Sequence, residues 1–345
     1  MLERLQVGID QSPLVIAELS GNHNGSLERA LAIVDAAADS GAHALKIQTY
    51  TADTMTLDIR DREFLISDPR SPWHGRTLHD LYREAHTPWD WHRPIFERAR
   101  ARGMIAFSTP FDPTAVDFLE SLDVPCYKIA SFEATDLPLI RRVAATGKPL
   151  IVSTGMASLA EIDALVRAAR AEGCRDLVLL KCTSSYPATP EHSNIRTIPL
   201  LRANFGCEVG LSDHTLGIGV AVAAVALGAS VIEKHFTLSR ADGGVDAAFS
   251  LEPREMRMLV DETQRAWQGL GEPTFGAGIT EEGSQVFRRS LYFVRDLAEG
   301  TEIGPEDVRS IRPGYGLSPH WKDHVIGRRV ARAVARGTPV TWGVL

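Results

Sequence analysis

The sequence contains few cysteines and no motif that would pair them for chemistry. Its 345 residues include only four cysteines, namely Cys126, Cys174, Cys182 and Cys207, and no two of them form a CxxC motif. This spacing excludes a zinc knuckle and a thioredoxin-type redox pair. Unpaired thiols are typical of a reducing compartment, so we expect a cytoplasmic protein.

Long apolar runs and an excess of positive charge are also missing. No stretch approaches the roughly 20 residues that a membrane-spanning helix needs, and the most apolar one, 217–229, is interrupted by glycines and predicts a buried helix. The first ten residues, MLERLQVGID, lack the apolar region of a signal peptide. The net charge is −7, whereas partners such as nucleic acid or an anionic membrane require a basic surface. We therefore expect neither partner, although a few local lysines would suffice for a small anionic substrate.

What the sequence does contain is a regular alternation of short apolar runs and amphipathic helical segments. Eight runs predict strands, at 14–19, 44–49, 104–109, 126–131, 149–154, 177–183, 207–212 and 230–235. Eight consecutive βα units predict a parallel sheet closed into a (β/α)8, or TIM, barrel over residues 1–270. A doubly wound Rossmann sheet is the alternative, but the first strand is followed by GNHNG (21–25) and not by GxGxxG.

Capping residues mark where the helices between these strands begin and end. Predicted starts are Ser26, Thr87 before Pro88, Asp112 before Pro113, and Ser158 with Glu161. Predicted ends are Gly41, Gly103, Gly147, Gly173 and Gly228. The stretch 52–84 between the second and third strands is long and polar, and we expect it to act as a lid at the catalytic face.

The character of the sequence changes after residue 270. Residues 271–284 are rich in Gly, Pro and Glu and predict a linker. Residues 285–345 contain short β-type runs, glycines and arginines. We therefore expect a separate small domain with little room for a large core.

Polar residues end nearly every predicted strand, which is where a barrel presents its functional groups. Lys46 and Gln48 share one face of the second strand because side chains alternate along a strand. The set comprises Glu18, Lys46, Gln48, Ser108, Thr109, Lys128, Ser131, Glu133, Ser153, Thr154, Thr183, Ser184, Tyr186, Ser212, Asp213, His214 and His235. We expect these side chains to surround a common site at the mouth of the barrel.

Two histidines of this set follow neighbouring strands. The imidazoles of His214 and His235 can therefore converge. Two imidazoles with open coordination positions suit a divalent ion that keeps water or substrate as ligands. The alternative is that one of them is a structural histidine held by hydrogen bonds.

Two lysines, Lys46 and Lys128, are expected inside the barrel, where a lysine is costly to bury without an anionic partner. The surrounding serines are Ser131, Ser153, Ser184 and Ser212. Such a group is typical of a cradle for a phosphate and a carboxylate. A barrel lysine can instead form a Schiff base, as in class I aldolases, or pair only with Glu18 or Glu133. Both carboxyl groups are also candidates for acid–base catalysis.

Many blocks of the chain, taken in order, resemble the bacterial nonulosonate synthases, the family that contains N-acetylneuraminate, legionaminate and pseudaminate synthases. These blocks are IAELSGNHNGSL (16–27), KIQTY (46–50), STPFD (108–112), YKIASFE (127–133), KPLIVSTGMA (148–157), KCTSSYP (181–187), GLSDHT (210–215), ALGASVIEKHFTL (226–238), DAAFSLEP (246–253), FRRSLY (287–292) and IRPGYGL (311–317). The C-terminal domain resembles the antifreeze-like (SAF) domain of these enzymes. In neuraminate synthases the segment after the sixth strand is similar to CTN-x-YP. This chain has Ser184 in place of the asparagine and is more similar to the pseudaminate-forming members.

The resemblance implies an activity. The members of this family condense phosphoenolpyruvate with an N-acylated amino-sugar aldehyde and release phosphate. For the pseudaminate-forming members the aldehyde is 2,4-diacetamido-2,4,6-trideoxy-L-altrose. It also implies a divalent ion, often Mn²⁺ with Mg²⁺ or Co²⁺ as alternatives, held by His214 and His235. A non-enzymatic carbohydrate- or ice-binding protein, suggested by the antifreeze-like tail, is an alternative of a different class.

Residue roles also follow from the resemblance. The positions implied to hold phosphoenolpyruvate are Lys46, Thr109, Lys128, Ser131, Ser153, Ser184 and Ser212. The sugar-side positions are Gln48, Tyr186, Asp246 and Arg312, and the catalytic ones are Glu18, Glu133, Lys46 and Lys128. Arg312 is implied to act in the barrel of the other subunit of a homodimer in which the SAF domain is swapped.

Overall fold

Eight parallel strands close into a barrel in the larger of two compact units. The computed structural model describes residues 7–69 and 71–345, so most of the N-terminal segment used above to argue against a signal peptide lies outside the described residues. The chain divides into one unit of Met1–Gly271 and another of Glu272–Leu345.

The barrel strands lie where the apolar runs predict them. They are β1 (Leu14–Glu18), β2 (Ala44–Thr49), β3 (Ile105–Pro110), β4 (Tyr127–Ile129), β5 (Leu150–Ser153), β6 (Leu177–Cys182), β7 (Glu208–Ser212) and β8 (Val231–His235). Each strand pairs in parallel with the next, and β8 pairs with β1 to close the barrel. The predicted fold class is therefore confirmed. The largest difference is at β4, which ends early because a 3-10 helix, η2 (Ser131–Glu133), follows it.

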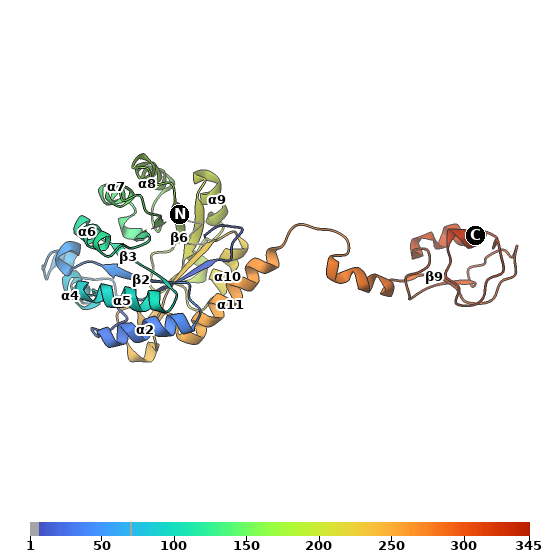
Figure 1. Cartoon of the computed structure of the whole chain (residues 1–345), viewed down its shortest axis with the longest axis horizontal. Coiled ribbons are helices and arrows are strands. Elements are labelled where there is room, and N and C mark those ends of the chain that lie inside the picture. Colours follow the sequence, from blue (N-terminus) through green and yellow to red (C-terminus); the bar gives the residue numbers. More distant parts are fainter. Residues whose placement is uncertain (1–6, 70) are drawn as a thin grey trace. The chain divides into compact units, whose positions relative to one another are not determined.

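Helices surround the strands (Figure 1). They are α2 (Leu27–Asp39), α3 (Ala52–Met55), α4 (Leu78–Ala85), α5 (Trp89–Ala101), α6 (Pro113–Ser121), α7 (Leu137–Ala144), α8 (Leu159–Ala171), α9 (Thr197–Phe205), α10 (Gly219–Ala226) and α11 (Pro253–Leu270). Shorter 3-10 helices are η1 (Arg62–Phe64), η3 (Pro190–His192), η4 (Arg240–Asp242) and η5 (Ala247–Phe249). Among the described residues no helix is long and apolar enough to cross a membrane.

The predicted caps form with one correction. Ser26 caps α2, Asp112 caps α6, and Ser158 forms a capping box with Glu161 at the start of α8. The prediction for α5 is wrong by one residue, because Pro88 occupies the cap position and the helix begins at Trp89. The ψ of Pro88 is 137°, which is extended backbone and keeps this residue outside the helix.

The alternation of inward and outward side chains along each strand determines which residues fill the barrel. Near the start of the strands the inward positions are apolar, with a cluster formed by Leu14, Ile16, Ala44, Phe107, Cys126, Ile151, Val178, Leu180 and Val231. One inward position further along, the residues are polar and still buried, namely Glu18, Lys46, Lys128, Ser153, Ser212 and Glu233. A parallel barrel brings these ends together, so a polar layer lies on an apolar floor.

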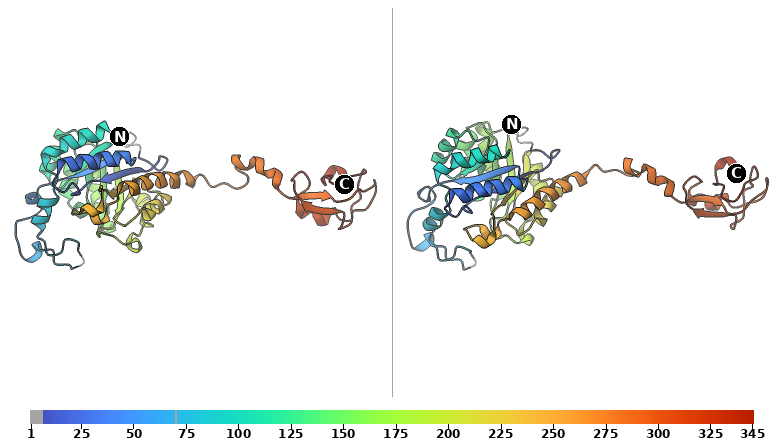
Figure 2. Two further views of the ribbon diagram at one scale, coloured as in Figure 1. Left: turned by 90° about the horizontal axis from the view of Figure 1, so that it is seen from below. Right: turned by 60° about the horizontal axis from the view of Figure 1, so that its bottom comes forward.

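The long stretch between β2 and β3 forms a folded excursion, described for residues 50–69 and 71–88 and drawn in light blue at one end of the barrel (Figure 2). Its outer part folds back on itself, since the amide of Ile66 donates to the carbonyl of Arg76 and that of Gly75 donates to the carbonyl of Ile66. His79 on α4 lies 2.9 Å from Asp53 on α3 and links the two short helices.

The smaller unit has a two-stranded antiparallel sheet, β9 (Ser290–Phe293) with β10 (Val308–Ile311). Its other elements are η6 (Ile279–Phe287), η7 (Pro319–Trp321), α12 (Lys322–Val325) and η8 (Trp342–Val344). The core is small and is built mainly from valines, leucines, Phe293 and Ile303. Within the stretch predicted as a linker, 271–284, η6 has already begun.

Candidate active site

Two lysines and two carboxyl groups share the polar layer of the barrel. The ammonium of Lys46 forms an ion pair with Glu18 and lies 3.9 Å from Glu233. The ammonium of Lys128 lies 3.3 Å from the other oxygen of Glu233. Lys46 also donates a hydrogen bond of 3.1 Å to the hydroxyl of Thr109. The predicted convergence of the lysines is therefore found, with Glu233 between them.

The charges of this layer are set by competing effects. Burial raises the pKa of Glu18 to about 7, and the neighbouring Lys46 opposes that rise. For Lys46, burial acts to lower the pKa, but Glu18 and Glu233 outweigh it and the pKa is raised. For Lys128, burial dominates and lowers the pKa, while Glu233 opposes it. An anion bound beside these groups would favour the protonated forms of all of them.

Three predicted serines lie at or just beyond the ends of β4, β6 and β7. The hydroxyl of Ser212 donates a 3.1 Å hydrogen bond to Glu233. The hydroxyls of Ser131 and Ser184 lie 2.7 Å apart, and a Cβ placed at Gly155 would lie only 2.4 Å from the Cβ of Ser131. The backbone after β5 therefore approaches this pair as only glycine allows. A fourth serine, Ser153, is buried and its hydroxyl has no partner, so it is free to bind a ligand.

Glu133 follows β4 on η2 and differs from Glu18 in its surroundings. Its Oε2 is buried and has no hydrogen-bond partner. Burial raises the pKa of Glu133 to about 7, with Lys128 opposing. A carboxyl group with a pKa near neutrality can both accept and return a proton at physiological pH.

The two predicted metal-binding histidines do converge. The rings of His214 and His235 have centroids 5.4 Å apart. Nδ1 of His214 lies 2.9 Å from the carbonyl oxygen of Thr183, and a histidine that donates through one nitrogen presents the other as a ligand. Nδ1 of His235 is buried without a hydrogen-bond partner. Burial, and next the neighbouring His214, hold the pKa of His235 well below its usual range, so the ring is neutral.

This arrangement fits a divalent ion that completes its coordination with other ligands. In residues 7–69 and 71–345 no group of three or more His, Cys, Asp or Glu side chains is arranged to hold a metal ion. The two imidazoles would therefore need oxygen atoms of water or substrate, which the open mouth of a barrel can supply.

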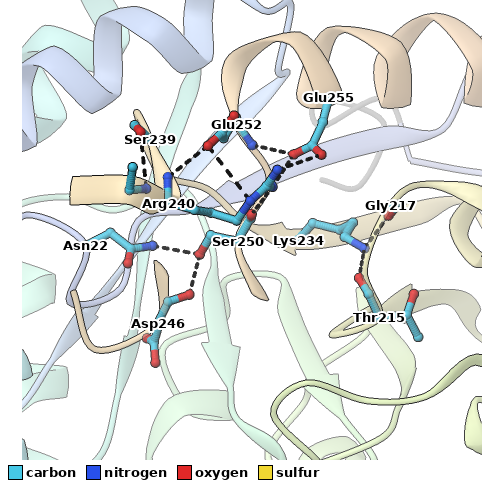
Figure 3. Close-up of polar contacts among 11 residues, drawn as sticks. Asn22, Thr215, Gly217, Lys234, Ser239, Arg240, Asp246, Ser250, Glu252 and Glu255 are labelled. Atoms are coloured by element: carbon cyan, nitrogen blue, oxygen red, sulfur yellow. Dashed lines mark hydrogen bonds and ion pairs between the residues drawn. The ribbon is translucent and has the colours of Figure 1, made fainter. Parts of the chain in front are cut away.

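Asp246 lies beside the histidines and is held by the loop that follows β1. Its carboxylate accepts a hydrogen bond from the hydroxyl of Ser20 and lies 3.6 Å from Nδ1 of His235. Its carbonyl accepts from Ser250, whose hydroxyl in turn accepts a 2.8 Å bond from the amide of Asn22 (Figure 3). Asn22 thus acts as a brace between the loops after β1 and β8, a role that the sequence did not indicate.

Aromatic rings line the same side of the mouth. The ring of Tyr186 lies 4.4 Å from that of His214 and 5.3 Å from that of Phe249. Phe249 in turn lies 5.0 Å from His235. Tyr186, a predicted sugar-side residue, therefore covers the histidine pair.

The remaining predicted sugar-side residues are Gln48 and Arg312. Gln48 is half-buried on β2, one inward position beyond Lys46. Arg312 is an exposed residue of the smaller unit and directly precedes Pro313. Its role in a partner barrel stays a prediction.

Besides Asn22, three residues that sequence reasoning missed belong to this region. Glu233 lies between the two lysines, and the alternation of VIEKH (231–235) carried a signal for it, since it shares a face with His235. Lys234, the next residue, is fully buried on the opposite face. Trp73 reaches the ring of Tyr186 from the excursion, and no local pattern indicated this.

Comparison with known proteins shows what this chain resembles. A family model described as the NeuB family matches residues 33–274, and a SAF domain model matches residues 288–345. The chain is 42% identical over 342 residues to the pseudaminic acid synthase of Campylobacter jejuni, covering 98% of this chain and 99% of that one. It is 36% identical over 347 residues to the N,N′-diacetyllegionaminic acid synthase of Legionella pneumophila, covering 97% and 95%. A solved structure of N-acetylneuraminic acid synthetase from Leptospira borgpetersenii matches with a TM-score of 0.71 and 31% identity, covering 79% of this chain and 90% of that one.

Proposed function

The chain belongs to the NeuB family, and on that premise we propose that it is a pseudaminic acid synthase. It would condense phosphoenolpyruvate with 2,4-diacetamido-2,4,6-trideoxy-L-altrose to give a nine-carbon α-keto acid and phosphate. The higher identity to a pseudaminic than to a legionaminic acid synthase supports this choice of sugar. Legionaminate and N-acetylneuraminate synthesis, with the same chemistry, are the alternatives.

The observation that carries the chemical part of the proposal is the meeting of Lys46 and Lys128 in the polar layer. Phosphoenolpyruvate carries a phosphate and a carboxylate, and buried ammonium groups with serine hydroxyls bind such anions. The unpartnered hydroxyl of Ser153 supplies a further donor. A class I aldolase would need a neutral lysine. The ion pair with Glu18 keeps Lys46 charged, so this role would fall to Lys128, whose pKa burial lowers.

In the proposed reaction the enol carbon of phosphoenolpyruvate attacks the aldehyde carbon of the open-chain sugar and forms the new C–C bond. Water then adds to the second carbon of the former phosphoenolpyruvate, and the C–O bond to phosphate breaks. Lys46 and Lys128 stabilise the negative charge that collects on the phosphate and carboxylate. Thr109, Ser131, Ser153, Ser184 and Ser212 orient these groups.

We assign the proton transfer from water to Glu133. Its Oε2 has no partner, whereas the carboxylate of Glu18 is held by Lys46 and by the amide of Ser20. Its pKa of about 7 matches the task of a general base at neutral pH. Glu18 instead balances the charge of Lys46 and can take up a proton when the anionic substrate binds.

His214 and His235 are the proposed ligands of a divalent ion, for which Mn²⁺ is preferred and Mg²⁺ and Co²⁺ are alternatives. When bound, such an ion supplies Lewis-acid activation of the aldehyde oxygen. Gln48, Tyr186 and Asp246 are the proposed sugar contacts of the same barrel, and Asp246 is fixed for this purpose by Ser20.

We further propose a cytoplasmic homodimer in which Arg312 of one subunit reaches the barrel of the other. All four cysteines are free thiols, which suits a reducing compartment. If Arg312 acts in this way, Arg312→Ala and Glu133→Ala homodimers should both be weak. Heterodimers formed by subunit exchange should regain one active site, and no recovery with exchange demonstrated would exclude the swap.

The test of the proposed function is a comparison of acceptor sugars. The enzyme is supplied with phosphoenolpyruvate, Mn²⁺ and one of three sugars: the altrose compound, 2,4-diacetamido-2,4,6-trideoxy-D-mannose or N-acetylmannosamine. Phosphate release and product mass are followed. The altrose compound should have the highest kcat/KM by at least about tenfold, the scale of one unmet polar contact. A better reaction with N-acetylmannosamine would disprove the subgroup and leave the condensing chemistry intact.

A further inference from the structure

Trp73 connects the excursion between β2 and β3 to the far side of the barrel mouth. It lies near the tip of the outer part of the excursion, between the paired residues Ile66 and Arg76. Its indole N–H donates a 2.8 Å hydrogen bond to the carbonyl of Val245. Val245 directly precedes Asp246, so the tip of the excursion is fastened beside the histidine pair.

The indole ring also extends the row of aromatic side chains at this place. Its centroid lies 5.8 Å from that of Tyr186, and Tyr186 in turn lies 5.3 Å from Phe249. We name Trp73, Tyr186 and Phe249 the aromatic wall. Phe249 is buried, whereas Trp73 and Tyr186 are each half-buried. Both residues are therefore only partly covered by the rest of the protein.

The wall gives the mouth two chemically different sides. The lysines and serines on β2 and on β4 to β7 supply charge and hydrogen bonds. The wall, which comes from the excursion and from the loops after β6 and β8, supplies apolar surface. A sugar that lies between them must present polar groups to one side and apolar groups to the other, because buried polar groups without partners are penalised.

We propose that Trp73 is a specificity-determining residue whose indole face packs against the deoxygenated end of the acceptor sugar. This inference rests on the proposed function. The 6-methyl group of the proposed acceptor is apolar, and an indole ring offers the largest apolar face of any side chain. A hydroxymethyl group at the same carbon would place a hydroxyl against the ring without a partner.

The expected size of the effect is moderate. Apolar sites reject an isostere with an added hydroxyl by about 100-fold at most, and one apolar carbon is worth about tenfold or more. Removing the indole should therefore reduce, and not abolish, the preference for a 6-deoxy sugar.

The test measures this preference as a ratio of kcat/KM values for two matched acceptors. These are the altrose compound and its 6-hydroxy analogue, 2,4-diacetamido-2,4-dideoxy-L-altrose. Trp73→Ala should lower the ratio by about tenfold and leave the KM for phosphoenolpyruvate within about twofold. Trp73→Phe keeps an aromatic face but loses the bond to Val245, and it should retain most of the preference.

Trp89→Ala is the matched control. Its indole also donates to a backbone carbonyl at the excursion, that of Tyr50 at 3.4 Å, but its ring stacks on Phe118 away from the wall. This variant should keep the wild-type ratio even if it is less stable.

Three outcomes separate the inference from the proposed function. If Trp73→Ala and Trp73→Phe lower kcat/KM equally for both acceptors, Trp73 only anchors the excursion and the inference is overturned. An unchanged ratio in Trp73→Ala overturns it as well. If the wild-type enzyme releases phosphate with neither acceptor but does so with N-acetylmannosamine, the proposed sugar is wrong and the inference falls with it.

Discussion

The ammonium of Lys234 lies 2.9 Å from a carboxylate oxygen of Asp213, and both groups are buried. The same ammonium donates to the carbonyls of Thr215, at 2.6 Å, and Gly217, at 2.8 Å (Figure 3). These three acceptors flank His214 on the loop after β7, and Lys234 directly precedes His235 on β8. One buried cation therefore fixes the loop that carries one proposed metal ligand to the strand that carries the other.

We predict that Lys234→Met lowers activity through the position of His214. The loss leaves a buried carboxylate unpaired, which costs about 3–5 kcal/mol of stability. Adding Asp213→Asn removes that charge and should recover much of the stability, measured by urea unfolding. Activity should stay low in the double variant, because the carbonyls of Thr215 and Gly217 still lack the ammonium group that donates to them in the wild type. Recovery of kcat together with stability would mean that the contact serves folding alone.

Glu233 should control the alkaline limit of the reaction. Burial lowers the pKa of Lys128, and Glu233 opposes this at 3.3 Å. In Glu233→Gln the pKa of Lys128 should fall further, by about one unit or more. The alkaline limb of kcat/KM for phosphoenolpyruvate should then move to lower pH. Glu120→Gln is a suitable control, since Glu120 contacts Lys148 and the hydroxyl of Tyr127 and not the two lysines of the polar layer. An unshifted limb in Glu233→Gln would contradict this assignment.

Glu133 should affect the pH dependence of both the stability and the reaction rate. Its pKa is raised by burial from 4.5 to about 7 in the folded protein. A raised carboxyl pKa gives stability that is complete below about pH 4.5 and is lost as the pH rises through 7. Between pH 5 and 8 the free energy of unfolding of the wild type should therefore fall by at most about 3 kcal/mol relative to that of Glu133→Gln.

Urea unfolding of both proteins at the two pH values measures this difference. The rate profile is the second readout, and the acid limb near pH 7 should vanish in Glu133→Gln together with most of the activity. A stability difference that does not change with pH would show that Glu133 is ionised throughout.

Metal binding should depend on both histidines. His214→Ala and His235→Ala should each lose bound Mn²⁺, measured by elemental analysis after gel filtration, and each should lose activity with an unchanged circular dichroism spectrum. His192→Ala is the control, because His192 is exposed on η3. EDTA should inactivate the wild type and Mn²⁺ should restore it. Full activity after exhaustive chelation would refute the metal site.

Local sequence was sufficient for the elements and for much of the site. Apolar runs placed all eight strands, and the rule that barrel strands end at one mouth placed Lys46, Lys128 and the two histidines together. The cap at α5 was wrong by one residue because a proline before a helix fits either the cap or the first turn, and only the backbone angles decide.

The sequence by itself determined which residues face the barrel interior, because inward and outward positions alternate along each strand whatever the loops do. Only the tertiary structure decided which of these residues meet. Glu233 reaches two lysines because strand register and barrel closure bring β8 beside β7 and across from β2 and β4. Trp73 meets Val245, a residue 172 positions away, because the excursion folds over the mouth. Such contacts depend on loop conformations, and loops carry no periodic pattern from which their partners could be read.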